Sequence, residues 1–381
     1  MSQSAPSPEV TPVNGWRDKR AFIQFPYKLY KDAPFWVPPL RMDTATQTNP
    51  KKNAFFAHGD MQLFLARDTS GQVVGRIAAI KNGMHLSKYD DGVGFFGYFE
   101  TIDDEATSRA LLDAAAQWLK AQGLSKMRGP ANPSLNDTAG LLVGGFDRQP
   151  SILMPYNFEY YQHHLENYGF SKVMTMWAYY GHARMNNVDR LRRGTDLLMK
   201  RWPTLSFRNL DMSRFEDEAR LLMDIYNDAW SENWGHVPMT EAEFSQLAKE
   251  MKQIIDPRLV IIVEDKGEAV AFAVSLPDLN YAFKTIPSGR LLPTGLLKLF
   301  FLASSGIIRE IRMPLMGVKK SHQGKSLDAI LVAKTSDIAL ELGLNGCEMS
   351  WVLDNNARLI NALETMGAIK DKEYALLECA I

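Results

Sequence analysis

The feature that most constrains the fold is an order of elements that occurs twice along the chain. In the first half, the apolar stretch GVGFFGYFE precedes the helical pattern TSRALLDAAAQWLKAQG, and in the second half EIRMPLMGV precedes LDAILVAKTSDIALELG. Gly97 and Gly123 are 26 positions apart, and so are Gly317 and Gly343. Such a period indicates one structural unit present in two copies.

Each half also carries a predicted β-hairpin ahead of this unit. Two apolar runs surround a polar, glycine-containing turn in MQLFLARDTSGQVVGRIAAI and in RLVIIVEDKGEAVAFAVSL. Helical material precedes each hairpin. The sequence therefore predicts an α/β (α+β) protein with two lobes in tandem, each a mixed, mostly antiparallel sheet flanked by helices. We expect the following division of the chain: a disordered lead over 1–19, a first lobe over 20–185, a linker near 186–193 and a second lobe over 195–381.

Composition excludes several classes of protein. Apolar residues make up 46% of the 381, and a net charge of -1 lacks the basic excess of a nucleic-acid-binding protein. The sequence has no run of 18 or more apolar residues, which is the length that a membrane-spanning helix needs. The N-terminal stretch does not resemble a signal peptide, so we expect a cytoplasmic protein. Cys347 and Cys379 lie in apolar runs and are expected to be buried free thiols. No His/Cys spacing predicts a metal site.

One stretch of the second half, GVKKSHQGKSLDAIL, joins a predicted strand to a predicted helix. Backbone N–H groups at such a helix N-terminus bind phosphate, and Lys319, Lys320 and Lys325 supply positive charge. Asp328, near the start of the helix, works against an anion unless its side chain points away. The alternative is an ordinary strand-to-helix turn with a solvated lysine cluster.

The matching turn of the first half, GYFETIDDEATSR, carries carboxylates where a phosphate would lie: Glu100, Asp103, Asp104 and Glu105. These charges would repel a phosphate. We therefore expect the first lobe to be structural or to bind the acceptor. Simple N-capping of an exposed helix accounts equally well for Asp103 and Asp104.

The order of elements and the turn of the second half together resemble the GNAT acyltransferase superfamily, over residues 20–185 and again over 195–381. The family's acyl-CoA turn, Gln/Arg-x-x-Gly-x-Gly/Ala, falls on Gln323–Asp328, where Ser326 and Asp328 replace its two glycines. Leu363 replaces the tyrosine that often protonates the leaving thiolate. The resemblance implies acyl-CoA as the donor, without a metal, and implies binding by these residues: Val318, Lys319, Gln323, Gly324, Lys325, Ser326 and Asn356.

Amide formation from a thioester needs a base, an oxyanion donor and a proton for the thiolate. In the GNAT-like frame, the backbone near Gly317–Val318 is the natural oxyanion donor. Three residues are candidates for the base: Glu348, His236 and Asp278. A carboxylate inside the apolar strand GCEMSWVL needs a partner or a task if it is buried, but strand alternation could instead place Glu348 on a solvent face. A lone histidine is more often structural.

A loop rich in tryptophan and asparagine follows the first helix of the second half. Its residues are expected to line the acceptor pocket, with simple helix packing as the alternative. The residues in question are Asn227, Trp230, Asn233 and Trp234.

An apolar insert, Gly295–Ile308, separates the second hairpin from the strand that follows it. It is too short to span a bilayer. Three readings remain open: a helix in peripheral contact with the inner membrane, a hydrophobic wall for a long acyl chain, or a core helix packed between the lobes.

The two-lobed layout with this insert resembles a bacterial tandem-GNAT family that includes bacterial ceramide synthases. The matching stretches are FPYKLYKDAPFWVPPL, GFFGYFE, NPSLNDTAGLLVGGFD, YNDAWSENWGHVP and SWVLDNN. The resemblance implies transfer of a fatty acyl group from its thioester to the amine of a lipid such as a sphingoid base. Two alternatives stay open: a GNAT enzyme that acts on a small or peptidic amine, and a non-catalytic acyl-CoA-binding or scaffold protein.

Overall fold

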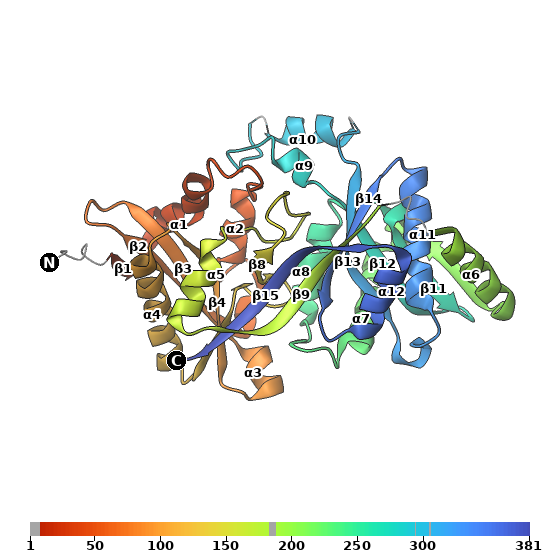
Figure 1. Ribbon diagram of the computed structural model, residues 1–381, viewed down its shortest axis with the longest axis horizontal. Helices are drawn as coiled ribbons and strands as arrows, with labels where there is room; N and C mark the ends of the chain where they lie inside the picture. The colour runs from red at the N-terminus through yellow and green to blue at the C-terminus, as the bar shows by residue number, and fades with distance from the viewer. Residues whose placement is uncertain (1–7, 183–187, 294, 305) are drawn as a thin grey trace. The chain divides into compact units, whose positions relative to one another are not determined.

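The computed structural model describes residues 8–182, 188–293, 295–304 and 306–381. They form two compact units (Figure 1). The first unit comprises residues up to Thr175 together with Phe283–Leu299 and Tyr374–Ile381, and the second comprises Met176–Ala282 and Phe300–Glu373. The lobe boundaries expected from the sequence, 20–185 and 195–381, remain a prediction.

The first unit is built from one sheet and its covering helices. In chain order its elements are β1 (Glu9–Pro12), α1 (Gly15–Leu29), α2 (Arg41–Gln47), η1 (Ala54–Ala57), β2 (Gly59–Arg67), β3 (Val73–Asn82), α3 (Gly83–Tyr89), β4 (Val93–Thr101), α4 (Glu105–Ala121), β5 (Lys126–Gly129), β6 (Ala131–Asn132), β7 (Thr138–Ala139), β8 (Leu141–Gly144), α5 (Tyr160–Tyr168) and the start of β9 (Ser171–His182). Strands β1 to β5 pair in sequence order, and only β4 and β5 are parallel.

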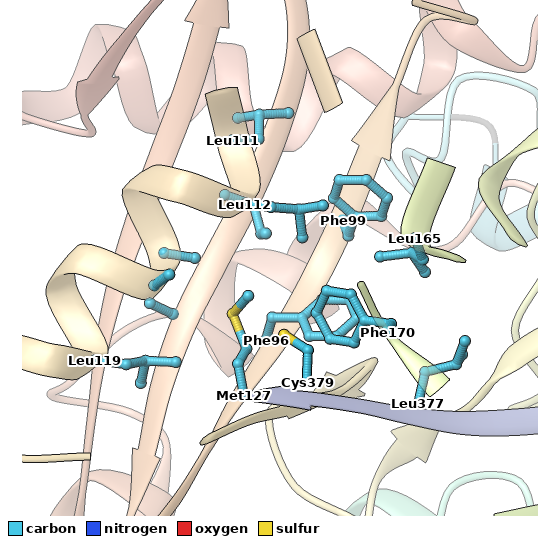
Figure 2. Packing of buried hydrophobic residues seen from close by; sticks show 14 of the residues in the cluster. Phe96, Phe99, Leu111, Leu112, Leu119, Met127, Leu165, Phe170, Leu377 and Cys379 are labelled. Carbon is cyan, nitrogen blue, oxygen red and sulfur yellow. The ribbon is translucent and has the colours of Figure 1, made fainter. Parts of the chain in front are cut away.

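The core of the first unit lies between this sheet and α4. Because successive strand residues point to opposite faces, Ile77 packs toward Leu111 of α4, whereas its neighbour Arg76 donates a hydrogen bond to the carbonyl of Phe22 in α1 at 2.7 Å. Figure 2 shows the α4 face, where leucines of the helix meet aromatic rings of β4 and, from the far end of the chain, Leu377.

The second unit repeats the plan. Its elements are the remainder of β9, α6 (Val188–Arg201), β10 (Leu205–Asn209), η2 (Met212–Arg214), α7 (Phe215–Trp230), α8 (Glu241–Met251), η3 (Pro257–Leu259), β11 (Val260–Asp265), β12 (Glu268–Pro277), β13 (Glu310–Val318), η4 (Lys320–His322), α11 (Leu327–Glu341), β14 (Gly346–Leu353), α12 (Ala357–Met366) and β15 (Ile369–Ala380), whose last part belongs to the first unit. Helices α9 (Asn280–Phe283) and α10 (Gly295–Ser304) lie where the chain passes between the units.

The sheet of the second unit runs β10-β11-β12-β13-β14-β9, and only β13 and β14 are parallel. Helices α11 and α12 cover the face of Ala271 and Ala273, and α7 covers the face of Phe272. At Gly317 the helix and strand approach closely, since an added Cβ would lie 2.8 Å from the Phe272 ring and 3.4 Å from Ala229. The predicted fold class is confirmed: each unit is a mixed, mostly antiparallel sheet flanked by helices.

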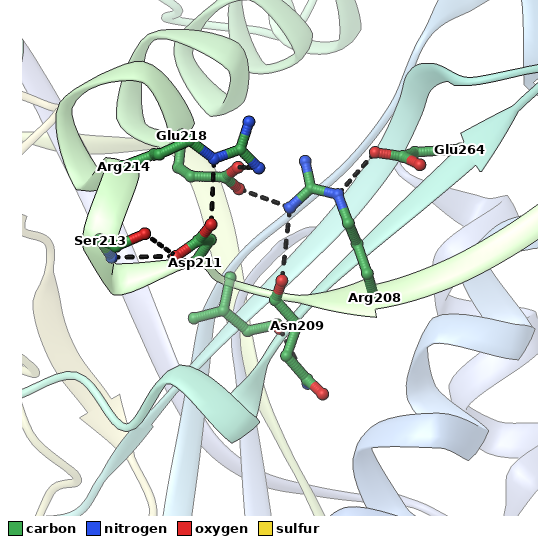
Figure 3. A network of polar contacts seen from close by, with 8 residues as sticks. Arg208, Asn209, Asp211, Ser213, Arg214, Glu218 and Glu264 are labelled. Atoms are coloured by element: carbon green, nitrogen blue, oxygen red, sulfur yellow. Dashed lines mark hydrogen bonds and ion pairs between the residues drawn. The ribbon is translucent and has the colours of Figure 1, made fainter.

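A polar network fixes the start of α7. Figure 3 shows Arg208 of β10 between Glu264 of β11 and Glu218 of α7, and its Nη1 donates to Glu218 Oε2 at 2.7 Å. Glu218 is buried and also contacts Arg214. A buried carboxylate held by two guanidinium groups sets the position from which α7 runs toward the loop at 231–237.

The expected disorder of the N-terminal lead is wrong in part. The lead over 1–19 is not disordered throughout, because Glu9–Pro12 pairs with β2 and α1 begins at Gly15; residues 1–7 lie outside the described residues. Part of the linker expected near 186–193 also lies outside them, and from Val188 onward the chain is helical.

Candidate active site

The turn between β13 and α11 keeps the backbone of a glycine-rich loop. Gly324 has φ +82° and Ser326, directly before α11, has φ +65°. The left-handed region is uncommon for a residue with a side chain, and glycine is the residue that adopts it freely. Ser326, which stands where the GNAT motif has glycine, therefore has a backbone conformation that glycine adopts freely, and the first amides of α11 lie at the turn.

Asp328 does not stand alone at this helix start. Its Oδ2 lies 3.2 Å from Nη2 of Arg358 in the first turn of α12, and its Oδ1 accepts from the N–H of Ala329 at 3.0 Å. Arg358 thus offsets the negative charge of Asp328, which was expected to oppose phosphate binding.

The three lysines of the turn have different partners. Lys319 Nζ lies 2.8 Å from Glu268 and Lys320 Nζ lies 2.6 Å from Glu232, whereas Lys325 Nζ lies over the ring of Trp202 at 4.8 Å from its centroid. Within the described part of the chain, Lys325 has no carboxylate at ion-pair distance. Gln323 donates from Nε2 to the carbonyl of Val318 at 3.2 Å, which closes the turn.

A hollow of about 560 Å³ adjoins the turn and is lined by Leu198, Trp202, Lys325 and Ser326. All four belong to the second unit. The hollow brings together a cation, an aromatic ring and a helix N-terminus, which are the groups that hold a phosphorylated nucleotide.

The strands beside the turn separate where a thioester would enter. Strands β13 and β14 pair from Glu310 to Met313 only, and beyond that point β13 stays bonded to β12. The N–H of Lys319 donates to Val270 O at 2.8 Å, so the alternation of an antiparallel ladder turns the N–H of Val318 away from β12. That N–H faces the side that β14 has left, as an oxyanion donor requires.

Glu348 lies at this separation and is buried, with 1% of its surface exposed. The Ser350 hydroxyl donates to Glu348 Oε1 at 2.8 Å and accepts from Arg312 Nε at 2.9 Å. Arg312 is itself buried and lies opposite Glu348 in the β13–β14 register. The alternative of a solvent face for Glu348 is therefore wrong, and the carboxylate belongs to a buried polar network.

His236 is 7% exposed and packs against aromatic side chains. Its ring lies 5.6 Å from that of Tyr226, which lies 5.0 Å from the ring of Trp230. Trp230 donates from Nε1 to the carbonyl of Met316 in β13 at 3.1 Å, so this aromatic wall borders the strand that carries Val318. The backbone N–H of His236 donates to Asn233 O at 3.1 Å, which makes the loop a tight turn.

The other residues of the expected acceptor pocket lie nearby. Trp234 is half-buried in the same loop. Asn227, on α7, has a buried Oδ1 with no hydrogen-bond donor among the described residues. A buried amide oxygen of this kind needs a partner and is suited to receive one from a bound molecule.

Two predicted site residues have local structural tasks. Asp278 Oδ1 accepts from the N–H of Asn280 at 3.1 Å at the start of α9. Asn356 Oδ1 accepts from the N–H of Leu359 at 3.2 Å and caps α12. Their roles as base and as cofactor ligand remain predictions.

The corresponding place in the first unit is filled by the chain itself. Strands β4 and β5 pair only from Val93 to Phe95, and beyond them the N–H of Tyr98 donates to Asn132 Oδ1 at 2.6 Å. An added Cβ at Gly97 would lie 1.8 Å from the carbonyl oxygen of Ala131. Asp104 caps α4 by accepting from Thr107 N at 2.9 Å, as the capping alternative expected.

Both cysteines are free thiols: Cys379 is buried, Cys347 is half-buried, and burial raises the pKa of each to about 12. Over the residues that the structure describes, no group of three His, Cys, Asp or Glu could hold a metal ion. No helix among them is long and apolar enough to cross a membrane.

Four residues of this site were not predicted for it. Arg312 and Ser350 had a signal, because both are polar residues inside apolar strands: Ser350 is two positions after Glu348 on β14, and Arg312 is on β13. Trp202 and Arg358 had none, because nothing in their neighbourhood indicates which helix packs beside the turn.

The chain is similar to two curated proteins over nearly its whole length. It is 38% identical over 381 residues to the bacterial ceramide synthase of Caulobacter vibrioides, covering 98% of this chain and 97% of that protein. It is 34% identical over 370 residues to Protein YghO of Escherichia coli, covering 95% of this chain and 92% of that protein. No family model matches the chain.

Two solved structures share the fold. A GCN5-related glucosamine N-acetyltransferase region of a fungal multi-domain β-N-acetylglucosaminidase matches with a TM-score of 0.59 and 14% identity; the match covers 99% of this chain and 38% of that one. A tandem GNAT protein from the clavulanic acid biosynthesis pathway matches with a TM-score of 0.55 and 11% identity, over 98% of both chains.

Proposed function

Because the chain belongs to the tandem GNAT N-acyltransferase family that includes the bacterial ceramide synthase, we propose that it transfers a fatty acyl group from CoA to the amine of a lipid such as a sphingoid base. The observation that carries this proposal is the turn at Ser326, whose left-handed backbone directly before α11 lies beside a separated pair of strands. Identity of 38% to a ceramide synthase over 98% of the chain supports the lipid acceptor.

The reaction uses the residues at the separation of β13 and β14. Glu348 takes a proton from the acceptor ammonium through the hydroxyl of Ser350, to which it is bonded at 2.8 Å. The free amine nitrogen attacks the thioester carbonyl carbon, and the N–H of Val318 stabilises the oxyanion. The carbon–sulfur bond then breaks, the attacking nitrogen gives up its second proton, and the departing CoA thiolate takes up a proton, so that the amide and free CoA remain.

Leu363 occupies the place of the usual tyrosine acid and is buried in the core of the second unit. A leucine carries no proton, so the thiolate is protonated by another group or by water. His236, at the end of the aromatic wall, is the second titratable side chain that we propose for this region.

The apolar insert supports a lipid acceptor. Leu292, Leu297 and Phe301 are 74%, 61% and 68% exposed, which disagrees with a core helix buried on all sides. Arg290 and Lys298 are exposed beside them. Exposed apolar side chains next to cations suit peripheral contact with an anionic bilayer, from which a lipid amine would be drawn.

The test is direct. The full chain is incubated with palmitoyl-CoA and sphinganine, free thiol is followed with a chromogenic reagent and the amide is identified by mass spectrometry. We expect one amide for each thiol released. Turnover with small amines alone would support the small-amine alternative, and no thiol release with acyl-CoA of any chain length would exclude the transferase activity.

A further inference from the structure

Trp202 forms a flat wall of the hollow beside the proposed pyrophosphate turn. It lies at the end of α6, a helix that precedes the repeated part of the second unit, and it lines the same hollow as Lys325 and Ser326. The hollow thus lies between the turn and the C-terminal end of α6.

The indole is held in one orientation. Its Nε1 donates to Asp265 Oδ1 at 3.1 Å, and the imidazole of His322 lies parallel to it, with the centroids 5.5 Å apart and the planes 12° apart. His322 also contacts Asp265 at 3.3 Å. An aromatic ring fixed on two sides is pre-organised for stacking, because little side-chain entropy is lost when a flat ligand binds.

Lys325 supplies the positive charge of the hollow. Its side chain is exposed, and its ammonium lies 4.8 Å from the Trp202 ring centroid. A long lysine chain can swing from the ring to a phosphate while a base takes its place on the indole. The hollow therefore offers a stacking surface and a cation to a group that is both flat and anionic.

We propose that this hollow binds the adenosine 3′-phosphate end of CoA, with the base stacked on Trp202 and a phosphate on Lys325. This rests on the proposed function, and it assigns to the site a preference for a nucleotide-bearing donor. A fatty acyl group carried on a carrier protein has phosphopantetheine but no adenosine, so it would leave the hollow empty.

The experiment compares two donors that share the thioester. Palmitoyl-CoA and S-palmitoyl-pantetheine are tested with wild type, W202L, W202F and K325A. For wild type we expect a KM at least tenfold lower for palmitoyl-CoA, because the pantetheine donor lacks both the base that stacks on Trp202 and the phosphates that the turn binds. W202L and K325A should raise the KM for palmitoyl-CoA about tenfold and about threefold and leave the pantetheine donor unchanged, whereas W202F, which keeps an aromatic ring, should lose less.

The matched control is K334A, because Lys334 lies on the same helix with its ammonium over Phe207, at 5.4 Å, and does not line the hollow. If W202L raises the KM equally for both donors, the substitution has damaged folding. The inference is then tested by K325A, which should raise the KM for palmitoyl-CoA alone. Equal KM values for the two donors in wild type would overturn the inference.

Adenosine 3′,5′-bisphosphate separates this inference from the proposed function. We expect calorimetry to detect its binding to wild type and not to W202L. Binding without any acyl transfer would overturn the proposed function alone. Acyl transfer without binding, and without competition by this nucleotide, would overturn the inference alone.

Discussion

Asp328 and Arg358 form an ion pair of 3.2 Å between the first turns of α11 and α12. The pair places a guanidinium next to the one carboxylate that stands inside the predicted phosphate turn. It explains how an acidic residue is tolerated at a position where the GNAT motif has glycine or alanine, since the charge is matched within the protein.

Removing the arginine should expose that charge to the donor. We expect R358A to raise the KM for acyl-CoA about fivefold, because Asp328 then faces the phosphates without a counter-charge. The double variant D328N/R358A should return the KM close to wild type. An equal rise in both variants, measured by steady-state kinetics at low salt, would contradict a charge-compensation role.

Replacing Ser326 with glycine should make the protein more stable. Its φ of +65° costs about 1 kcal/mol for a residue with a Cβ, and glycine avoids that cost. S326G should therefore raise the midpoint of thermal unfolding, whereas S326A, which keeps the Cβ, should not. The two variants are compared by calorimetry without ligand, and equal midpoints would mean that the conformation is not strained.

Substitution of Glu348 should reduce turnover without weakening the binding of acyl-CoA. E348Q keeps the shape of the side chain and removes its basicity, so kcat should fall about 100-fold while the KM for acyl-CoA stays unchanged. S350A should show a smaller loss, because it interrupts the contact at 2.8 Å. E264Q is the matched control, since its carboxylate pairs with Arg208 of β10 and is not a candidate for the base.

Substitution of His236 also tests whether Glu348 is the base. H236A should keep kcat within about threefold if Glu348 is the base. A large fall in H236A with normal turnover in E348Q would transfer the role to the histidine. Full turnover in both variants would show that the base lies elsewhere.

Glu100 should make the free energy of unfolding depend on pH. Burial raises the pKa of its carboxyl to about 6 from an ordinary 4.5, although Arg76 lies 3.4 Å away. Folding thus favours the protonated form. Its contribution to the free energy of unfolding is full below about pH 4.5 and is lost as the pH rises to about 6, a change of about 2 kcal/mol.

The measurement compares wild type with E100Q by chemical denaturation between pH 4 and pH 8. The difference between the two proteins should change across that window and level off above it. E105Q, whose carboxylate is half exposed on α4, should track wild type. A difference between wild type and E100Q that is independent of pH would show that the Glu100 carboxyl titrates normally.

The exposed face of α10 predicts membrane binding. L297S/F301S should reduce co-sedimentation with anionic vesicles about tenfold, because two exposed apolar side chains and their burial in the interface are lost. I369S removes an equally exposed apolar residue from β15 and should have no effect. Wild-type protein that stays in the supernatant at low salt would rule out this contact.

Periodicity predicted the repeated elements well, since alternation in strands and the helical pattern survive in any packing. The strand at Glu9–Pro12 was not predicted, because it forms by pairing with β2 and its own residues show no strand pattern. The sequence left two faces open for Glu348, and only the register with Arg312 decides between them. The conformation of Ser326 was likewise invisible, because residue type indicates what a turn prefers and not what the surrounding strands impose.

The last part of β15 has a consequence for the order of synthesis. Leu377 pairs with Gly129 and Cys379 with Met127, so residues 374–381 complete the sheet of the first unit (Figure 1). The part of the protein that leaves the ribosome first therefore waits for more than two hundred further residues before its own core can close. Until then β5 lacks its partner on that edge, and an unpaired strand edge can pair with a strand of another chain.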